Sequence, residues 1–406
     1  MSKGTVMETT AGRGRAAMRI IAVVALASLA GAVVWHWTWF WGGSQPYYFF
    51  DTDFYRKAVV AVQHGVPMYQ AMAYPPFAYL LIWWLPALSM VVGDQLWTAA
   101  SFVVLIAVGF LLTARALQTT GRNWRDDRGA LIIWGSVNSI LLMISMPMYS
   151  QFTCGQLSLF VAALAFVDVC GVLPKRFQGT LVGLAAAIKV TPMIFAVYYL
   201  VTGQRRQALN AVGSFAAFTA FGALFFPSDT LAFWTRLTST GEEVDPLLNY
   251  NLGIRSVLAR ISLDLSQLSW LWGGLGLVLL VITLWRSRKL YQRNQVMEAA
   301  LIVGSAAIVV VPNALPHYFL WLPMAAIWLV MTGGRAAKVL GVLIYVVYSP
   351  LYYFVVLPFM NTADSTWHNA LSVLTIVPML LGVFGLPKRP VYADAESPAV
   401  PAVVPV

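Results

Sequence analysis

The stretch AAMRIIAVVALASLAGAVVWHW, residues 16–37, holds one cation among apolar and small side chains. As a helix rising about 1.5 Å per residue, it is long enough to cross a hydrocarbon core of about 30 Å. It is long for the core of a signal peptide and has no convincing cleavage site, so we expect a retained first helix. Apolar runs of roughly 18 to 22 residues recur along the chain, which predicts an all-α polytopic membrane protein.

The composition agrees with a membrane protein. The 406 residues are 59% hydrophobic and 10% charged, whereas a soluble domain carries about 25% charged residues. The net charge of +10 is compatible with nucleic-acid binding, but the cations lie between apolar runs and favour membrane topology instead. Cys154 and Cys170 are separated by a predicted helix, about 24 Å at helical rise, which excludes a disulfide.

Twenty of the 26 cations fall into seven clusters between apolar runs. If all seven are cytoplasmic, the chain obeys the positive-inside rule, with both termini inside and about twelve membrane segments. The expected units are one transmembrane domain over 1–390, its first outer loop at about 38–94, and a disordered cytoplasmic tail over 391–406. The clusters are Lys3/Arg13/Arg15/Arg19, Arg115/Arg122/Arg125/Arg128, Lys175/Arg176, Arg205/Arg206, Arg286/Arg288/Lys289/Arg293, Arg335/Lys338 and Lys388/Arg389.

Two segments depart from simple spans. Residues 75–92 are apolar enough to span, but spanning would move the Arg122 cluster outside, so we expect a juxtamembrane helix anchored by Trp83 and Trp84. Residues 178–203 have cations at both ends and therefore predict a V of two short helices with its tip at residues 189–192. The other spans are expected near 95–117, 130–148, 157–173, 207–226, 268–285, 297–313, 318–333, 338–357 and 368–386.

The six cations outside the clusters map to the outer face. Lys189 stands out because it lies at the tip of the V, where an unpaired ammonium is costly. A phosphate at this face would explain both Lys189 and Arg255, since cations are the usual phosphate partners. The ordinary alternative is a few solvated loop cations, which we expect for Arg236. The six are Arg56, Lys57, Lys189, Arg236, Arg255 and Arg260.

Asp51 and Asp53 stand in the first outer loop, although only 16 residues of the chain are Asp or Glu. They are either solvated loop acids or functional groups at the edge of the bilayer, where a carboxylate is expensive to place. Their D-x-D spacing also occurs in nucleotide-sugar enzymes that use a metal, but nucleotide sugars are absent from the outer face. His317 opens an outer-side span, and structural and functional roles remain equally open. Asp168, inside a span, is expected to be a satisfied structural residue.

Four motifs, in the same order along the chain, resemble those of glycosyltransferase family 87. The members of this family are membrane enzymes of the GT-C class. Asp51 with Tyr55 and Ala58 begins the first motif, which continues with G-x-P-x-Y and Y-P-P over residues 65–69 and 74–76. Gly155-Gln156 resembles the family's G-Q, and residues 183–192 resemble G-L-A-x-x-x-K-x-x-P, with Lys189 as the lysine. Residues 251–255 resemble N-Q-S-L-R, although leucine and glycine replace the glutamine and serine. The similarity runs from about residue 16 to 390.

The resemblance implies a GT-C fold and an enzyme without cofactor or metal. It implies transfer of mannose from a polyprenyl-phosphate donor to a glycolipid, with an α-1,2 bond to a phosphatidylinositol mannoside as the best match. The active site would lie on the outer face of the plasma membrane. Asp51 would be the catalytic base, supported by Asp53 and His317, and Lys189 and Arg255 would bind the donor phosphate. Further substrate contacts would come from Tyr55, Arg56, Gln156 and Asn251.

Two other classes fit a basic, polytopic chain. A secondary transporter would have inverted repeats and acids on several spans, but the sequence has no repeat and one acid within a span, Asp168. A flippase for lipid-linked sugars would need the cations of the outer face but not Asp51.

Overall fold

The computed structural model describes residues 3–42, 49–72, 74–236, 251–260, 265–351 and 372–387, in which every regular element is helical. The predicted all-α class is therefore confirmed for these residues. The acid run 242–245 and the predicted tail 391–406 lie outside them. The helices are α1 (Lys3–Gly42), α2 (Phe50–Gln63), α3 (Met68–Ala71), α4 (Pro76–Ile82), η1 (Leu85–Ala87), α5 (Met90–Thr119), α6 (Arg128–Ile144), α7 (Met146–Cys154), α8 (Ser158–Val169), α9 (Thr180–Ile188), η2 (Thr191–Met193), α10 (Ile194–Val201), α11 (Arg205–Phe225), α12 (Pro227–Thr235), α13 (Ile254–Arg260), α14 (Leu265–Gln292), α15 (Val296–Val310), η3 (Pro316–Tyr318), α16 (Trp321–Thr332), α17 (Arg335–Val347) and α20 (Ser372–Phe384).

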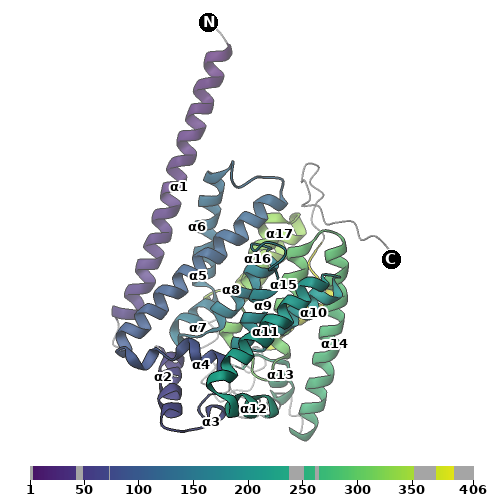
Figure 1. Ribbon diagram of the computed structural model, residues 1–406. Coiled ribbons are helices and arrows are strands. Elements are labelled where there is room, and N and C mark those ends of the chain that lie inside the picture. Colours follow the sequence, from purple (N-terminus) through teal and green to yellow (C-terminus); the bar gives the residue numbers. More distant parts are fainter. Residues whose placement is uncertain are drawn as a thin grey trace.

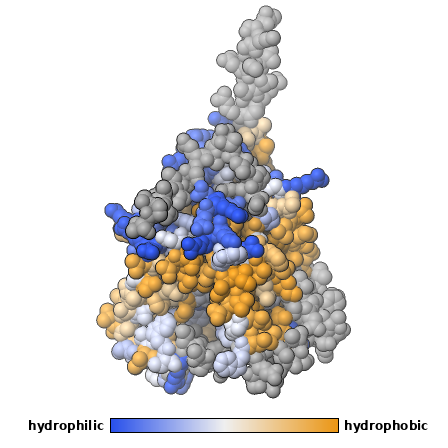
Figure 2. Space-filling model, turned by 90° about the vertical axis from the view of Figure 1, so that its right-hand side faces the viewer, coloured by the Kyte–Doolittle hydropathy of each residue, from blue (hydrophilic) through white to orange (hydrophobic). Residues whose placement is uncertain are grey.

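Among the described residues, four helices are long and apolar enough to cross a bilayer, and they lie in α1, α5, α11 and α14. The pair α6 and α7 would make a fifth span, bent by 66° at its break. Figure 2 shows a broad hydrophobic band across the molecule, with a strongly hydrophilic region on one side and a mixed surface on the other. These features are those of a polytopic membrane protein.

Several predicted spans are shorter helices in the structure. Helices α8, α15 and α16 have 12, 15 and 12 residues. Almost every residue of α15 and α16 is buried, Trp328 completely. A helix that is apolar all round must be surrounded by other elements, and the buried residues of these two helices belong to the main core cluster.

The basic clusters within the described residues gather at one end of the bundle, and the cluster Lys388/Arg389 lies outside those residues. The α5–α6 connection lies at the upper end in Figure 1, whereas α2, α3, α12 and α13 lie at the lower end. Cys170 Sγ lies 3.7 Å from Met297 Sδ, which joins the end of α8 to the start of α15. The Asn210 side chain donates to the carbonyl of Arg176 at 2.9 Å, which brings two more basic loops together. We call this the basic end.

The predicted V over residues 178–203 is present as α9 and α10. Gly179 lies against the backbone of Gln207, and Gly183 against Ala211 and Ser214, so α9 runs alongside α11 in the same direction. Since α10 is joined to the start of α11 by residues 202–204 alone, α10 returns to the end where α9 began. Lys189 ends α9 in an extended conformation, which places the break at the predicted tip.

The Asp168 carboxylate holds the start of α9, as expected for a structural acid. Oδ1 accepts from the Gly179 amide at 2.7 Å and from the Tyr199 hydroxyl at 2.6 Å. Oδ2 accepts from the amides of Leu181 and Val182 at 2.8 and 3.2 Å. The free amides at the start of α9 thus receive a buried anion, which also complements the helix dipole.

The segment at 75–92 differs from its prediction. Its helix α4 has only seven residues, most of them buried, and α5 already begins at Met90. Gly222 allows close approach, because a Cβ there would lie 2.9 Å from the Phe77 amide nitrogen. α4 therefore packs against α11. Trp83 packs on Phe226 with ring centres 5.5 Å apart, and only Trp84 is exposed.

Candidate functional site

The first turn of α2 is fixed against the last turn of α7. The Phe49 amide donates to the Thr153 carbonyl at 2.6 Å, and Phe49 itself has a left-handed φ of 68°. Gly155 also has a positive φ, 70°, and a Cβ there would lie 2.7 Å from Thr52. Glycine adopts this conformation without steric cost. The pairing brings Asp51 to the C-terminal end of α7.

Asp51 and Asp53 have different partners although both belong to the first turn of α2. Residues two positions apart on a helix project about 200° apart. Asp53 forms an ion pair with Lys57 at 2.5 Å, one helical turn on. Asp51 is hydrogen-bonded by the side chains of Gln156 and Cys154 and is attracted by Lys189. Only Asp51 thus reaches the other predicted site residues.

Gln156 connects the first outer loop to α7. Its side-chain oxygen accepts from the Tyr55 hydroxyl at 2.9 Å and from the Tyr74 hydroxyl at 3.5 Å. Its backbone carbonyl accepts from the Trp97 indole at 3.4 Å. The Tyr55 ring meets Tyr74 edge-on with centres 6.0 Å apart. The G-Q motif and the first outer loop, far apart in sequence, therefore form one network beside Asp51.

Lys189 presents a buried ammonium without a hydrogen-bond partner among the described residues. The nitrogen lies 3.5 Å from the centre of the Tyr318 ring and 5.6 Å from that of Tyr74. Aromatic faces attract cations, but they do not replace the hydrogen bonds that the ammonium would make in water. An anionic ligand could therefore accept the hydrogen bonds of this ammonium that no described residue accepts.

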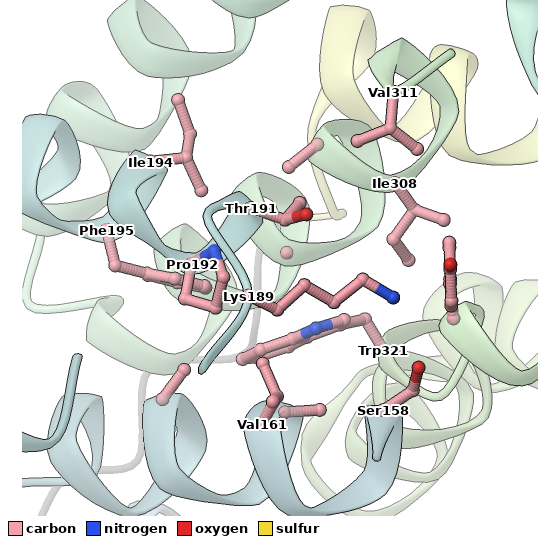
Figure 3. Close-up of a pocket in the computed structure, with 15 residues that line it drawn as sticks. Ser158, Val161, Lys189, Thr191, Pro192, Ile194, Phe195, Ile308, Val311 and Trp321 are labelled. Atoms are coloured by element: carbon pink, nitrogen blue, oxygen red, sulfur yellow. The ribbon is translucent and has the colours of Figure 1, made fainter. Parts of the chain in front are cut away.

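This lysine lines an apolar cavity. Figure 3 shows the Lys189 side chain extended, with its nitrogen between Ile308 and Ser158 and beside Trp321. The other walls come from α8, η2, α10 and α15. The polar side chains of the lining are Lys189, Ser158, Thr191 and Tyr318, together with the indole nitrogen of Trp321. The remaining lining residues are Val161, Ala162, Ala165, Pro192, Ile194, Phe195, Gly304, Ala307, Ile308, Val311 and Trp321.

His317 lies at the same site. Its Nδ1 atom is 3.3 Å from the Ser150 hydroxyl, and its ring meets Tyr318 edge-on. Its Nε2 atom is buried and has no hydrogen-bond partner among the described residues. His317 thus has one nitrogen engaged by α7 and one available to a ligand, in the field of Lys189.

Burial raises the pKa of Asp51 to about 6. The hydrogen bond from Gln156, the charge of Lys189 and the hydrogen bond from Cys154 each act in the opposite direction and limit the rise. A carboxylate with this pKa is mostly ionised at neutral pH and is a stronger base than a solvated aspartate. This environment suits proton abstraction from a hydroxyl group.

Two further residues predicted to contact substrate, Arg56 and Asn251, have partners within the protein. Arg56 donates to the backbone carbonyls of Leu85 and Leu88, the latter at 2.6 Å, so it fastens α2 to η1. Asn251 accepts from the Ala314 amide at 3.1 Å and donates to Asn313 at 3.0 Å. Both residues stabilise loops here, and their predicted contacts with substrate stay predictions.

Arg255 lies in the first turn of α13 and is partly buried. The turn before it approaches the cavity, because a Cβ on Gly253 would lie 3.2 Å from the carbonyl of Val311, a lining residue. Its predicted phosphate contact is compatible with this position and stays a prediction.

The sequence analysis missed three residues of the site: Tyr74, Tyr318 and Cys154. Tyr74 begins the Y-P-P motif and Tyr318 follows His317, so each adjoined a residue already singled out. Cys154 precedes the G-Q pair but carried no pattern of its own. Its contact with Asp51 depends on the pairing of α2 with α7, which single-sequence patterns do not reveal.

Comparison with known proteins gives a consistent result. The sequence model of glycosyltransferase family 87 matches residues 72–312, a range that includes Gln156, Lys189 and Arg255 and begins after Asp51. A Mycobacterium tuberculosis protein, named polyprenol-phosphate-mannose-dependent alpha-(1-2)-phosphatidylinositol mannoside mannosyltransferase, is 27% identical over 331 residues, 77% of each chain. A Mycolicibacterium smegmatis protein of the same name is 26% identical over 73% of this chain and 68% of its own. No solved structure matches.

Proposed function

The chain belongs to glycosyltransferase family 87, and from this premise we propose that it transfers mannose from a polyprenyl-phosphate-mannose donor to a phosphatidylinositol mannoside. The related mycobacterial enzymes carry this donor and this acceptor class in their names. The bond formed would be α-1,2. Donor and acceptor are both membrane lipids, in keeping with the apolar surface of the protein.

The observation that carries the proposal is the buried Lys189 ammonium in the lining of an apolar cavity. A polyprenyl phosphate has the complementary chemistry, an anionic head on a long hydrocarbon chain. The phosphate would replace the missing hydrogen-bond partners of Lys189, and Arg255 and His317 would add contacts from α13 and η3. The prenyl chain would follow the apolar walls formed by α8, α10 and α15.

The reaction would be a single displacement with inversion. Asp51 would remove the proton of the acceptor hydroxyl as its oxygen bonds to the anomeric carbon of mannose. The bond from that carbon to the phosphate oxygen would break, and polyprenyl phosphate would leave with the electron pair. An inverting transfer needs one base on the face opposite the leaving group. Charge on the departing phosphate would be stabilised by Lys189, so the mechanism requires no metal.

The membrane arrangement proposed is the GT-C fold, with about twelve segments and residues 1–390 as one catalytic domain. Both termini and the basic end would face the cytoplasm, following the positive-inside rule. Asp51, Lys189 and His317 would then lie on the outer face. The long spans, with the shorter apolar helices between them, support this topology.

The test is a transfer assay with the full-length protein reconstituted in liposomes. Polyprenyl-phosphate mannose with radiolabelled sugar and phosphatidylinositol mannosides are supplied, and the labelled glycolipid is separated and digested with an α-1,2-mannosidase. Formation of a mannosidase-sensitive product that requires Asp51 supports the proposal. Movement of the donor across the bilayer without a new glycolipid would instead identify a flippase.

A further inference from the structure

The last turn of α7 and the residues after it surround the Asp51 carboxylate from one side. Cys154 and Gln156 each hydrogen-bond this carboxylate, and Gly155 between them allows α2 to approach. The backbone bond from Phe49 to Thr153, 2.6 Å, fixes the two elements at the same point. Two donors on a preformed turn therefore face the acid proposed to act as base.

The orientation of the Gln156 amide follows from its other contacts. Its oxygen is 2.9 Å from the Tyr55 hydroxyl, which donates to it, and 3.5 Å from that of Tyr74. The NH₂ group, which is the donating half of the amide, is thereby left for Asp51. Tyr55 is almost completely buried and packs beside Trp97. Its hydroxyl group, which donates to the Gln156 oxygen, is therefore fixed in place.

We propose that Cys154 and Gln156 are positioning residues that hold Asp51 ionised and aimed at the acceptor hydroxyl. This inference deepens the transferase function proposed above and rests on it. It assigns Gln156 to the base instead of the substrate contact expected from sequence. It also gives a role to a cysteine for which no motif accounts.

Removing a hydrogen-bond donor to Asp51 should shift the pH dependence of transfer in one direction. Donors to a carboxylate favour its charged form, so removing one raises the pKa of Asp51. The base must be ionised, and the acid limb of kcat/KM therefore moves to higher pH. For the wild-type protein this limb is expected near pH 6, the pKa of Asp51. The titratable groups facing Asp51 are Lys189, Cys154, Tyr55, Tyr74 and Tyr318.

The experiment measures kcat/KM for mannose transfer from pH 4.5 to 8.5. Cys154→Ala removes a weak donor, and its acid limb should rise by about 0.5 to 1 pH unit; Gln156→Leu should raise it by about 1 to 2 units. Cys154→Ser keeps a donor of similar size and should restore the wild-type limb. Cys170→Ala is the matched control, because this other cysteine is buried against Met297 at the basic end.

Other outcomes contradict the inference. The inference is wrong for Cys154 if the pH profile of Cys154→Ala superimposes on the wild-type profile. It is also wrong if Cys154→Ala lowers the rate without shifting the acid limb and Cys154→Ser does not restore the rate. Either result would mean that Cys154 contributes only packing. If the acid limb of kcat/KM is not shifted in Gln156→Leu, Gln156 does not position Asp51. Absence of transfer by the wild-type protein is a separate result, because it overturns the proposed function and this inference with it.

Discussion

The Lys189 nitrogen lies 3.5 Å from the centre of the Tyr318 ring, and no described group accepts a hydrogen bond from it. The charge of Asp51 attracts it. In a water-excluded site, such a cation gains strongly from a ligand anion. This relationship supports the proposed role of Lys189 in binding the donor phosphate.

Lys189→Ala should therefore weaken use of the polyprenyl-phosphate donor. A hydrogen bond to a charged group contributes about 1.5–3 kcal/mol, so kcat/KM for the donor should fall by about 10- to 100-fold. The protein should remain folded, because an unsatisfied buried charge is removed. The measurement is transfer rate against donor concentration in liposomes.

Arg236→Ala is the matched control, since Arg236 is exposed at the end of α12. Its transfer kinetics should equal those of the wild-type protein. Equal losses in both variants would mean that the separation of buried from surface cations is wrong.

Asp168→Ala should destabilise the protein. The substitution would leave three backbone amides and the Tyr199 hydroxyl without their acceptor. Each buried orphaned group costs about 1–3 kcal/mol, and partial relaxation with water leaves an expected total of about 3–5 kcal/mol. Thermal unfolding in detergent would measure the effect. Asp126→Ala, at an exposed loop acid, should leave the melting temperature unchanged, and a similar temperature for both variants would refute the capping role.

The V around Lys189 was predictable because it follows from charge. Cations at both ends of residues 178–203 require both ends on one side, and an apolar stretch of that length can return only through a break. Lys189 and Pro192 marked the place. Asp168 was likewise predictable, since an acid among apolar residues must be satisfied.

The partners of the first outer loop could not be predicted. Asp51 and Asp53 were expected in a loop, where D-x-D spacing does not separate them. Once Phe50 begins a helix, the two acids project in different directions, and that start depends on the contact between Phe49 and Thr153. Arg56 is similar, because its carbonyl partners belong to η1, whose position depends on packing. The sequence identified the residue types, and tertiary contacts assigned their roles.

Membrane sidedness can be tested by cysteine labelling. If the basic end is cytoplasmic, Arg125→Cys in the α5–α6 loop should resist an impermeant maleimide added to intact cells. Lys57→Cys, at a side chain that is 74% exposed, should react. Both should react after permeabilisation, and the unsubstituted protein gives the background. Labelling of Arg125→Cys in intact cells would show that the α5–α6 loop is outside the cell and that the proposed orientation is wrong.

The last prediction separates the two acids of α2. Asp51→Asn keeps the shape and removes the proton acceptor, so turnover should fall by about 10² to 10⁴. Asp53→Asn loses only an ion pair with Lys57, a surface contact that contributes about 0–1 kcal/mol, and should remain active. Single-turnover transfer with saturating donor, at pH 7.5 where Asp51 is ionised, measures both.

The same pair of variants can contradict the assignment in two ways. An inactive Asp53→Asn beside an active Asp51→Asn would mean that the acid engaged with Lys57 is the base and that the spacing to Tyr55 and Ala58 misled the sequence analysis. Near-normal transfer by both would move the base elsewhere. His317 is then the next candidate, because its buried Nε2 has no hydrogen-bond partner among the described residues, and His317→Ala would be measured in the same assay.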